Sequence, residues 1–437
     1  MADAEAVLRE AIDGGICGSQ PKQQLVNLLA STTGFAAAEK ELQGLIAAEP
    51  ETYVYAFRLA ELYRKEKQPE RAEAVLKRVI EQDGKGPNGL AARAGLARLR
   101  LAAGDRAAAE ALIAEVLDED PANVDVLMMR AALSLEKGKN EAAITDLRTV
   151  LRNNPRSTPA LRMLAEAHAR AGEIDLATDV LKQLVDIDPR DNQARERLAF
   201  FLVQRGQPDA ALELLNEALT NEPNSAQALA AKADLLLSRF EWAEAEATIE
   251  RLLALPDRQA MGQRLSGRLY QAQGRHHEAI AAFEKALELE PGAIAPLTGI
   301  VVSYLAQDKP EEAQAYLEGV IAKTPENPVA HNLLGEVLVR EKNPDAAAGS
   351  FRRSIELRKD WPVPYANLGR VLILDGKTQE AITVYRQALA EFPNNQGLML
   401  ALAEAQQRAD DDQGAMATYE GAQYPGIEQA QAILKNM

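Results

Sequence analysis

The residue types that bind metals or perform acid–base chemistry are few and poorly spaced in this chain. Its four histidines are His168, His276, His277 and His331. Only two of them are neighbours, and adjacent residues on a helix point roughly 100° apart, which disfavours a shared metal ion. The run 410–412, three aspartates, lacks the glycine and glutamate of a calcium-binding loop. Phosphate-binding, nucleophile-elbow and zinc-protease motifs are absent from the sequence. We therefore predict no catalytic residue, no metal site, no cofactor and no enzymatic activity.

Arg264 and Arg268 are the best candidates for recognition chemistry. They are four residues apart and share one face of any helix that contains them. Guanidinium groups bind carboxylates and other anions through paired hydrogen bonds, so the two side chains can form a local anion site. What this site can bind depends on the elements that carry it.

Residues 362–395 indicate what those elements are. Apolar or small residues recur at the spacing of one helix face on each side of Gly376: Tyr365, Leu368, Gly369 and Leu372 before it, and Ala381, Tyr385 and Ala388 after it. Gly376 suits a tight turn, because glycine adopts left-handed backbone conformations without steric cost. Pro393 lacks an N–H and ends the second helix. The stretch therefore predicts two helices joined by a turn.

Pro393 belongs to a regular series of prolines. Pro87, Pro121, Pro155, Pro189 and Pro223 are spaced by 34 residues, and Pro291, Pro325 and Pro393 continue the register. This pattern resembles the tetratricopeptide repeat of about 34 residues, in which an aromatic residue, Leu-Gly, Ala and Pro follow one another in this order. The resemblance implies an all-α fold, a right-handed α-solenoid of helix-turn-helix units. Neighbouring units must stack, because one helix pair cannot bury both of its faces.

The repeat divides the chain into three parts. Residues 1–18 are expected to be the leading helix of a truncated repeat, residues 19–429 twelve repeats, and residues 428–437 a capping helix. The polar residues just after the prolines are predicted N-caps of the first helices: Asn123, Ser157, Asp191, Ser225 and Asn327. The leading half-repeat suggests that the chain was cut from a longer protein, and such a cut could have removed an export signal or membrane anchor.

Composition narrows the possible partners and compartments. The chain has 437 residues, 47% hydrophobic and 26% charged, and a net charge of −16. This charge argues against nucleic-acid binding, which needs a basic face. No apolar run reaches the roughly 20 residues of a membrane span. The single Cys17 excludes an internal disulfide. We expect a cytoplasmic protein by default, and a periplasmic or envelope protein if an N-terminal signal or anchor was removed.

In the resembled family, the first helix of each repeat lines a concave groove. The resemblance implies that the following residues face it and bind the partner: Arg58, Arg64, Arg98, Met128, Met129, Arg162, Met163, Arg197, Phe200, Asp234, Arg264, Arg268, Asn332 and Arg370. Basic residues outnumber acidic ones at the groove positions, which favours an acidic ligand. Two alternatives remain open at this point. The arginines can pair within their own helix, as in Arg58/Glu61, Arg162/Glu166 and Glu336/Arg340, and the methionines can be partly buried between helices.

We therefore predict a non-enzymatic scaffold that binds an extended peptide or protein segment in its groove, and the groove arginines favour an acidic one. Met128, Met129, Met163 and Phe200 are its expected apolar anchors, and Arg264 and Arg268 its expected anion site. The alternative is a periplasmic or envelope module for exopolysaccharide assembly or secretion that binds a charged glycan. The sequence leaves the oligomeric state open.

Overall fold

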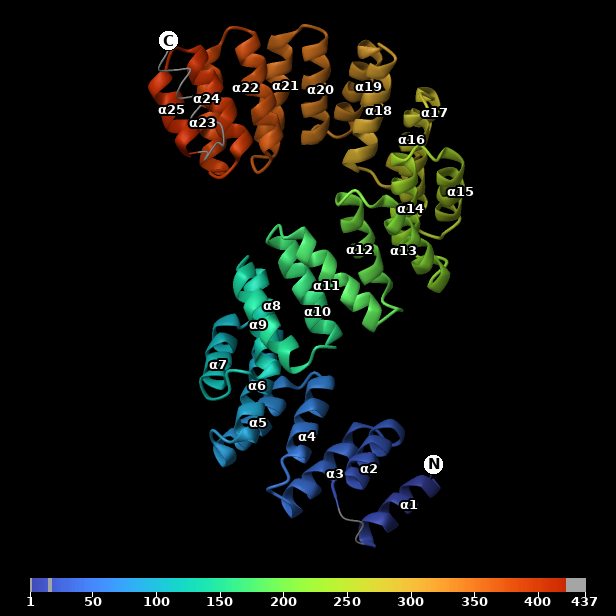
Figure 1. Cartoon of the computed structure of the whole chain (residues 1–437), viewed down its shortest axis with the longest axis vertical. Coiled ribbons are helices and arrows are strands. Elements are labelled where there is room, and N and C mark those ends of the chain that lie inside the picture. Colours follow the sequence, from blue (N-terminus) through green and yellow to red (C-terminus); the bar gives the residue numbers. More distant parts are fainter. Residues whose placement is uncertain (1, 15–17, 422–437) are drawn as a thin grey trace. The chain divides into compact units, whose positions relative to one another are not determined.

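The computed structural model describes residues 2–14 and 18–421 and forms 25 α-helices there, with no β-strand in these ranges (Figure 1). The chain divides into two compact units, Met1–Arg205 and Gly206–Met437. The predicted all-α solenoid class is confirmed. The predicted capping helix at 428–437 and Cys17 lie outside the described residues.

The first unit contains a single leading helix followed by helix pairs. Its helices are α1 (Ala2–Asp13), α2 (Gln20–Thr32), α3 (Phe35–Ala48), α4 (Val54–Lys65), α5 (Pro69–Asp83), α6 (Pro87–Ala102), α7 (Arg106–Glu119), α8 (Val124–Glu136), α9 (Asn140–Asn153), α10 (Thr158–Arg170), α11 (Ile174–Ile187) and α12 (Asn192–Gln204).

The second unit continues the alternation. Its helices are α13 (Pro208–Asn221), α14 (Ala226–Ser238), α15 (Trp242–Leu253), α16 (Gln259–Ala272), α17 (His276–Leu289), α18 (Ile294–Ala306), α19 (Pro310–Lys323), α20 (Pro328–Arg340), α21 (Pro344–Leu357), α22 (Pro362–Leu374), α23 (Thr378–Glu391), α24 (Gln396–Arg408) and α25 (Asp412–Gly421). We call the even-numbered helices from α2 first helices and the odd-numbered helices from α3 second helices. The division into twelve repeats remains a prediction.

Capping side chains define where many first helices begin. Asn123, Asp191 and Ser225 each accept a hydrogen bond from the backbone amide three residues on, and Asn327 accepts two. Ser157 was also expected to cap its helix, but its side chain makes no capping bond. Pro159, at the second helical position, has no amide to donate, so of the two amides that a capping oxygen can accept from only that of Ala160 remains.

The turn inside each pair needs a left-handed residue. A glycine with φ between 70° and 79° takes this place at Gly104, Gly138, Gly172, Gly206, Gly274 and Gly376. Where the sequence has no glycine, another residue adopts the same conformation, as Lys67 does with φ 56° and Lys342 with φ 59°. The left-handed backbone conformation at the turn is therefore kept even where a side chain makes it less favourable.

Contact between first and second helices is closest where glycine faces an aromatic ring. A Cβ atom placed on Gly267 or on Gly299 would lie 2.5 Å from an atom of the Phe283 ring, which is 1% exposed. A Cβ atom on Gly335 would likewise lie 2.5 Å from an atom of the Phe351 ring. The small residue that the repeat pattern places in the first helix thus makes room for the large residue of the second.

Candidate functional site

Most of the predicted arginines of the first unit form ion pairs. The Arg64 guanidinium lies 2.6 Å from Glu61, and that of Arg98 lies 3.8 Å from Asp125. Arg162 pairs with Asp191, and Arg197 with Glu166. Arg58 is exposed, and the structure gives it no ion pair within the described ranges.

These pairs are not the within-helix pairs that we considered from the sequence. Glu61 pairs with Arg64 rather than Arg58, and Glu166 pairs with Arg170 and Arg197 rather than Arg162. Glu336 accepts hydrogen bonds from Asn332 and Asn367, not from Arg340. The reason is geometric. Arg162 and Arg197 reach acids 29 and 31 residues away, in a neighbouring repeat, and such an acid competes with those on the arginine's own helix.

In the second unit, Arg264 and Arg268 lie on α16 at the edge of a shallow cavity of about 330 Å³. Arg268 forms an ion pair with Asp234, which comes from the preceding first helix, α14. The half-buried Arg264 makes no ion pair or side-chain hydrogen bond with any residue of the described part of the chain. Of the two arginines expected to bind an anion, one is free to do so and the other shares its charge with Asp234.

The remaining wall of this cavity is formed mainly by α18. Val302 from α18 is 50% exposed and contributes an apolar surface beside the arginines. Gln271 donates hydrogen bonds to the Gly299 carbonyl at 2.9 Å and to Ser303 Oγ at 3.0 Å, so it fixes α16 to α18. The surface that we call the α16–α18 cavity therefore combines one free cation with an apolar wall.

The predicted apolar anchors are mostly part of the core. Met129 is 9% exposed, and Met128 and Met163 are half-buried against the core of the first unit. Phe200 differs, with 60% of its surface exposed, while the adjacent Phe201 is buried. Only Phe200, with its exposed neighbour Val203, presents a large apolar surface to solvent among these anchors.

Asn332 and Arg370 belong to a network of amides between α20 and α22. Asn332 is 3% exposed and donates to Glu336 Oε1 at 2.7 Å. Asn367 donates to Asn332 Oδ1 at 3.1 Å and to Glu336 Oε1 at 3.0 Å, and Arg370 donates to Asn367 Oδ1 at 3.0 Å. These side chains therefore connect two first helices.

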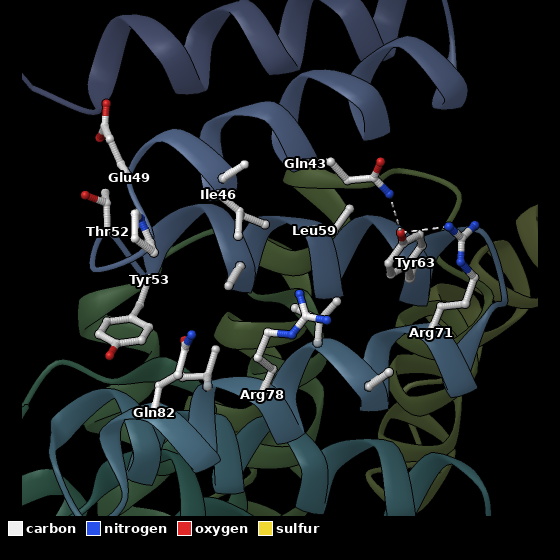
Figure 2. A pocket seen from close by; sticks show the side chains of 16 residues that line it. Gln43, Ile46, Glu49, Thr52, Tyr53, Leu59, Tyr63, Arg71, Arg78 and Gln82 are labelled. Carbon is white, nitrogen blue, oxygen red and sulfur yellow. Dashed lines mark hydrogen bonds between the residues drawn. The ribbon is translucent and has the colours of Figure 1, made fainter.

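A larger pocket, which the sequence analysis did not anticipate, lies among α3, α4 and α5 (Figure 2). Its volume is about 510 Å³. Ile46 from α3, Leu59 from α4 and Val75 from α5 supply apolar lining, while arginine, glutamine and tyrosine side chains supply its polar part. We call it the α3–α5 pocket. The sequence did not predict this pocket, because the family resemblance points to residues of the first helices, whereas two of the three walls of the pocket are second helices.

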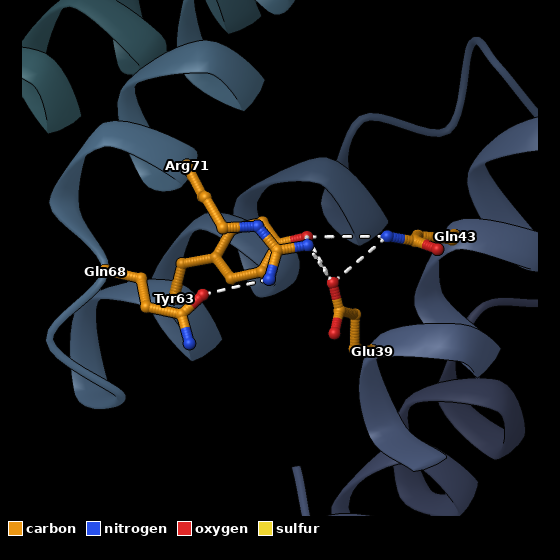
Figure 3. A network of polar contacts seen from close by, with 5 residues as sticks. All are labelled: Glu39, Gln43, Tyr63, Gln68 and Arg71. Atoms are coloured by element: carbon orange, nitrogen blue, oxygen red, sulfur yellow. Dashed lines mark hydrogen bonds and ion pairs between the residues drawn. The ribbon is translucent and has the colours of Figure 1, made fainter. Parts of the chain in front are cut away.

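One end of the α3–α5 pocket is closed by a polar network (Figure 3). The Arg71 guanidinium lies 4.2 Å from the centre of the Tyr63 ring, donates to Tyr63 Oη at 2.9 Å and forms an ion pair with Glu39. Tyr63 Oη donates to Glu39 Oε1 at 2.8 Å. Burial, together with the bond to Glu39, raises the pKa of the Tyr63 hydroxyl. Gln43 and Gln68 complete the network, so Arg71 is fully engaged.

The opposite end carries an acid that is also engaged. Glu49 pairs with Lys22 of α2, and this pairing lowers the pKa of the Glu49 carboxyl. Tyr55 Oη donates to the same carboxylate at 3.3 Å. Arg78, from α5, also lines the pocket, is exposed, and has no ion pair or hydrogen bond to another residue that the structure describes. It is the free charge of the pocket.

Two other kinds of feature, a metal site and a membrane-spanning helix, are absent from the described residues. Over residues 2–14 and 18–421, no three or more His, Cys, Asp or Glu side chains gather as a metal site would need. In these ranges no helix combines the length and apolar character that crossing a bilayer needs. His168 is 2% exposed, with Nδ1 at 2.6 Å from Glu173 Oε2, as expected of a packing residue.

Comparison with known families gives matches along the chain. Sequence profiles described as tetratricopeptide repeat match residues 24–87, 94–147, 134–199, 202–269, 270–337, 304–368 and 372–425. Together these ranges cover most of the sequence.

Similarity to individual proteins is local. A stretch of 99 residues, 23% of this chain, is 30% identical to the Hsp70-Hsp90 organizing protein of Triticum aestivum and covers 17% of that protein. A stretch of 94 residues, 22% of this chain, is 29% identical to the uncharacterized protein y4yS of Sinorhizobium fredii and covers 52% of it. The chain thus matches about half, or much less, of each relative's length.

Two solved structures resemble the fold. A tetratricopeptide repeat protein from Parabacteroides merdae aligns with 57% of this chain and 98% of its own, at 18% identity and a TM-score of 0.45. Yeast Tom70 aligns with 88% of this chain and 95% of its own, at 16% identity and a TM-score of 0.48.

Proposed function

Because this chain belongs to the tetratricopeptide repeat family, we propose that it is a non-enzymatic scaffold that binds an extended, acidic segment of a partner protein on its first helices. Stacked repeats offer long surfaces to extended ligands. The matched relative from wheat is named as an organizing protein for two other proteins, which supports a role in protein interaction. The α16–α18 cavity is the part of the first helices that we assign to the partner's acidic residue.

The observation that carries this assignment is the free guanidinium of Arg264 beside exposed apolar surface. A charge already paired inside the protein must give up its partner before it binds a ligand, which offsets much of the gain. Arg264 has no such partner in the described residues, whereas Arg268 is held by Asp234. A ligand carboxylate therefore gains most from Arg264, and its neighbouring apolar side chain contacts Val302.

Affinity purification from lysate and envelope fractions of the source cell, with the wild-type chain and an Arg264→Glu variant side by side, tests the proposal. Arg264 is the better position for the substitution, because Arg268→Glu would also place a second carboxylate beside Asp234. The matched control is Arg386→Glu on the second helix α23, where the arginine is exposed and makes no ion pair with any residue of the described part of the chain. We expect a protein retained by wild type and control and lost with Arg264→Glu.

The binding constant of the purified partner then gives the size of the effect. Charge reversal at one arginine that contacts a carboxylate costs about 2 kcal/mol or more, roughly a thirtyfold loss of affinity. Binding should also weaken as salt is added, because the contact is partly exposed. Equal retention by all three proteins would reject the cavity as the site. Retention of a polysaccharide instead of a protein would replace the protein ligand with a charged glycan.

A further inference from the structure

We propose that the α3–α5 pocket is a second, separate binding site, which accepts a large apolar side chain flanked by an acidic residue from a peptide segment of a partner protein. Two of its three walls are second helices of the first unit, and it shares no residue with the α16–α18 cavity of the proposed function. Pocket size, lining and free charge each contribute to this inference.

The size and lining of the pocket fit a bulky apolar group. Its volume of about 510 Å³ lies within the roughly 300–1,000 Å³ of ligand pockets in proteins. Ile46, Leu59, Val75 and Val79 line it, and burying an apolar side chain against such a wall contributes about 25 cal/mol per Å² removed from water. Ala74 also lines the pocket and is exposed, so its small side chain helps to keep the space open.

The charges of the pocket select an acid over a base. Arg71 is neutralised by Glu39, and Glu49 by Lys22. Arg78 is left as the cation without a partner in the described residues, and Figure 2 shows it among the labelled lining side chains, between Arg71 and Gln82 along α5. A carboxylate next to the inserted apolar group can accept two hydrogen bonds from this guanidinium.

The polar groups around Arg78 favour a peptide. Gln82 lines the pocket and makes no side-chain hydrogen bond within the described residues, and Thr52, which also lines it, adds a hydroxyl beside the Glu49 carboxylate. An amide or hydroxyl at the edge of a pocket can form hydrogen bonds with the N–H and C=O groups of a peptide backbone. A carboxylic acid with a plain hydrocarbon chain lacks these backbone groups. The occupant that matches all of these groups is therefore a chain segment with adjacent apolar and acidic residues.

The test uses short synthetic peptides and the full-length chain. Acetyl-Leu-Phe-Asp-amide is titrated by ligand-observed NMR, beside the same peptide with Asn in place of Asp. We expect millimolar or tighter binding of the Asp peptide, roughly tenfold tighter than the Asn peptide, as one charge-assisted pair provides. Arg78→Gln should abolish that preference, and Ala74→Phe, which fills the pocket from an exposed position, should prevent binding of both peptides.

Lys77→Gln is the matched control. It removes a positive charge from the same helix at an exposed residue that does not line the pocket and pairs with Glu73. This variant should bind as wild type does, and circular dichroism should show unchanged helix content in all variants. Absence of binding at millimolar peptide, equal binding of the Asp and Asn peptides, or an unaltered preference in Arg78→Gln would each overturn the proposal. Arg264→Glu should have no effect here, so this result and that for the proposed function are independent.

Discussion

Second helices pack against their first helices in two ways, which one second helix from each unit illustrates. In the second unit, Phe283 lies against Gly267 and Gly299, so closely that a Cβ on either glycine would be 2.5 Å from the ring. In the first unit, Leu147 of α9 occupies the same place in the repeat pattern and shares its core cluster with Ala131 and Ala160. The Phe283 ring leaves no room for a Cβ on the glycines that face it, whereas Leu147 is accommodated with alanines in its cluster.

The difference shows that neighbouring helices keep a distance at which two facing residues, one from each helix, together fill the space between them. Either a large ring with glycine or a smaller aliphatic side chain with alanine fills the space, and both solutions occur in one chain. Protein interiors are close-packed, so the two members of each pair cannot be exchanged independently. Two substitution experiments test this pairing of large and small residues, and a third experiment tests the burial of another ring that faces a glycine.

The largest effect is expected from Phe283→Ala. Its ring is 1% exposed and contacts both neighbouring first helices, so its removal leaves a cavity that α16 and α18 cannot both close. We expect a loss of about 3–5 kcal/mol in the free energy of unfolding. Urea denaturation gives the total, and hydrogen exchange should show lost protection in α16–α18 rather than throughout the chain.

The comparison would fail if Leu147→Ala, in the first unit, cost clearly more than Phe283→Ala. That outcome would mean that the aliphatic packing is the more tightly fitted of the two. Equal costs would mean that the ring gives no advantage over leucine.

An intermediate effect is expected from Gly299→Ala. The new Cβ collides with the Phe283 ring, and overpacking of this kind costs about 1–3 kcal/mol. In a Phe283→Leu background the same change should cost less, by about 1 kcal/mol or more, because leucine leaves room for the methyl group. Denaturation of the four proteins of this double-mutant cycle measures the coupling, and additive costs would show that the ring and the glycine act independently.

The smallest effect concerns alkaline pH. Burial raises the pKa of Tyr385 from 10 to about 12, because the phenolate is poorly solvated beside Gly369. The unfolded chain releases this proton near pH 10 and the folded chain near pH 12, so the stability that Tyr385 contributes is present below pH 10 and lost between the two values. At pH 11 the loss is roughly 1 kcal/mol.

Tyr385→Phe lacks this proton and is the control. Its stability should fall less than that of the wild type when both are denatured in urea at pH 9 and at pH 11. Parallel losses in the two proteins would mean that Tyr385 does not titrate abnormally.

The fold was predictable because its signals repeat. Proline at a 34-residue interval, glycine at the inter-helix turn and small residues opposite large ones gave the helix pairs and even their packing partners. Local detail was less predictable. α6 begins at Pro87, a member of the proline series in which Pro393 is predicted to end a helix, because proline at the first helical position has no amide to satisfy.

The candidate sites were only partly predictable, because pairing between repeats is not visible along one helix. The spacing of Arg264 and Arg268 predicted a shared face, but not that Asp234, 34 residues before Arg268, would take one of them. Arg71 and Arg78, seven residues apart with Ala74 and Val75 between them, were the available signal for the α3–α5 pocket. Recognising it required knowing which arginine Glu39 neutralises.

The contacts between helices have a consequence for how the chain folds. All substantial contacts join helices that are one or two positions apart along the sequence. Closing such short loops costs little entropy, so structure can begin at several places and spread to neighbours without waiting for distant segments. During synthesis, each helix pair can therefore become ordered soon after it leaves the ribosome, supported by the pair made just before it.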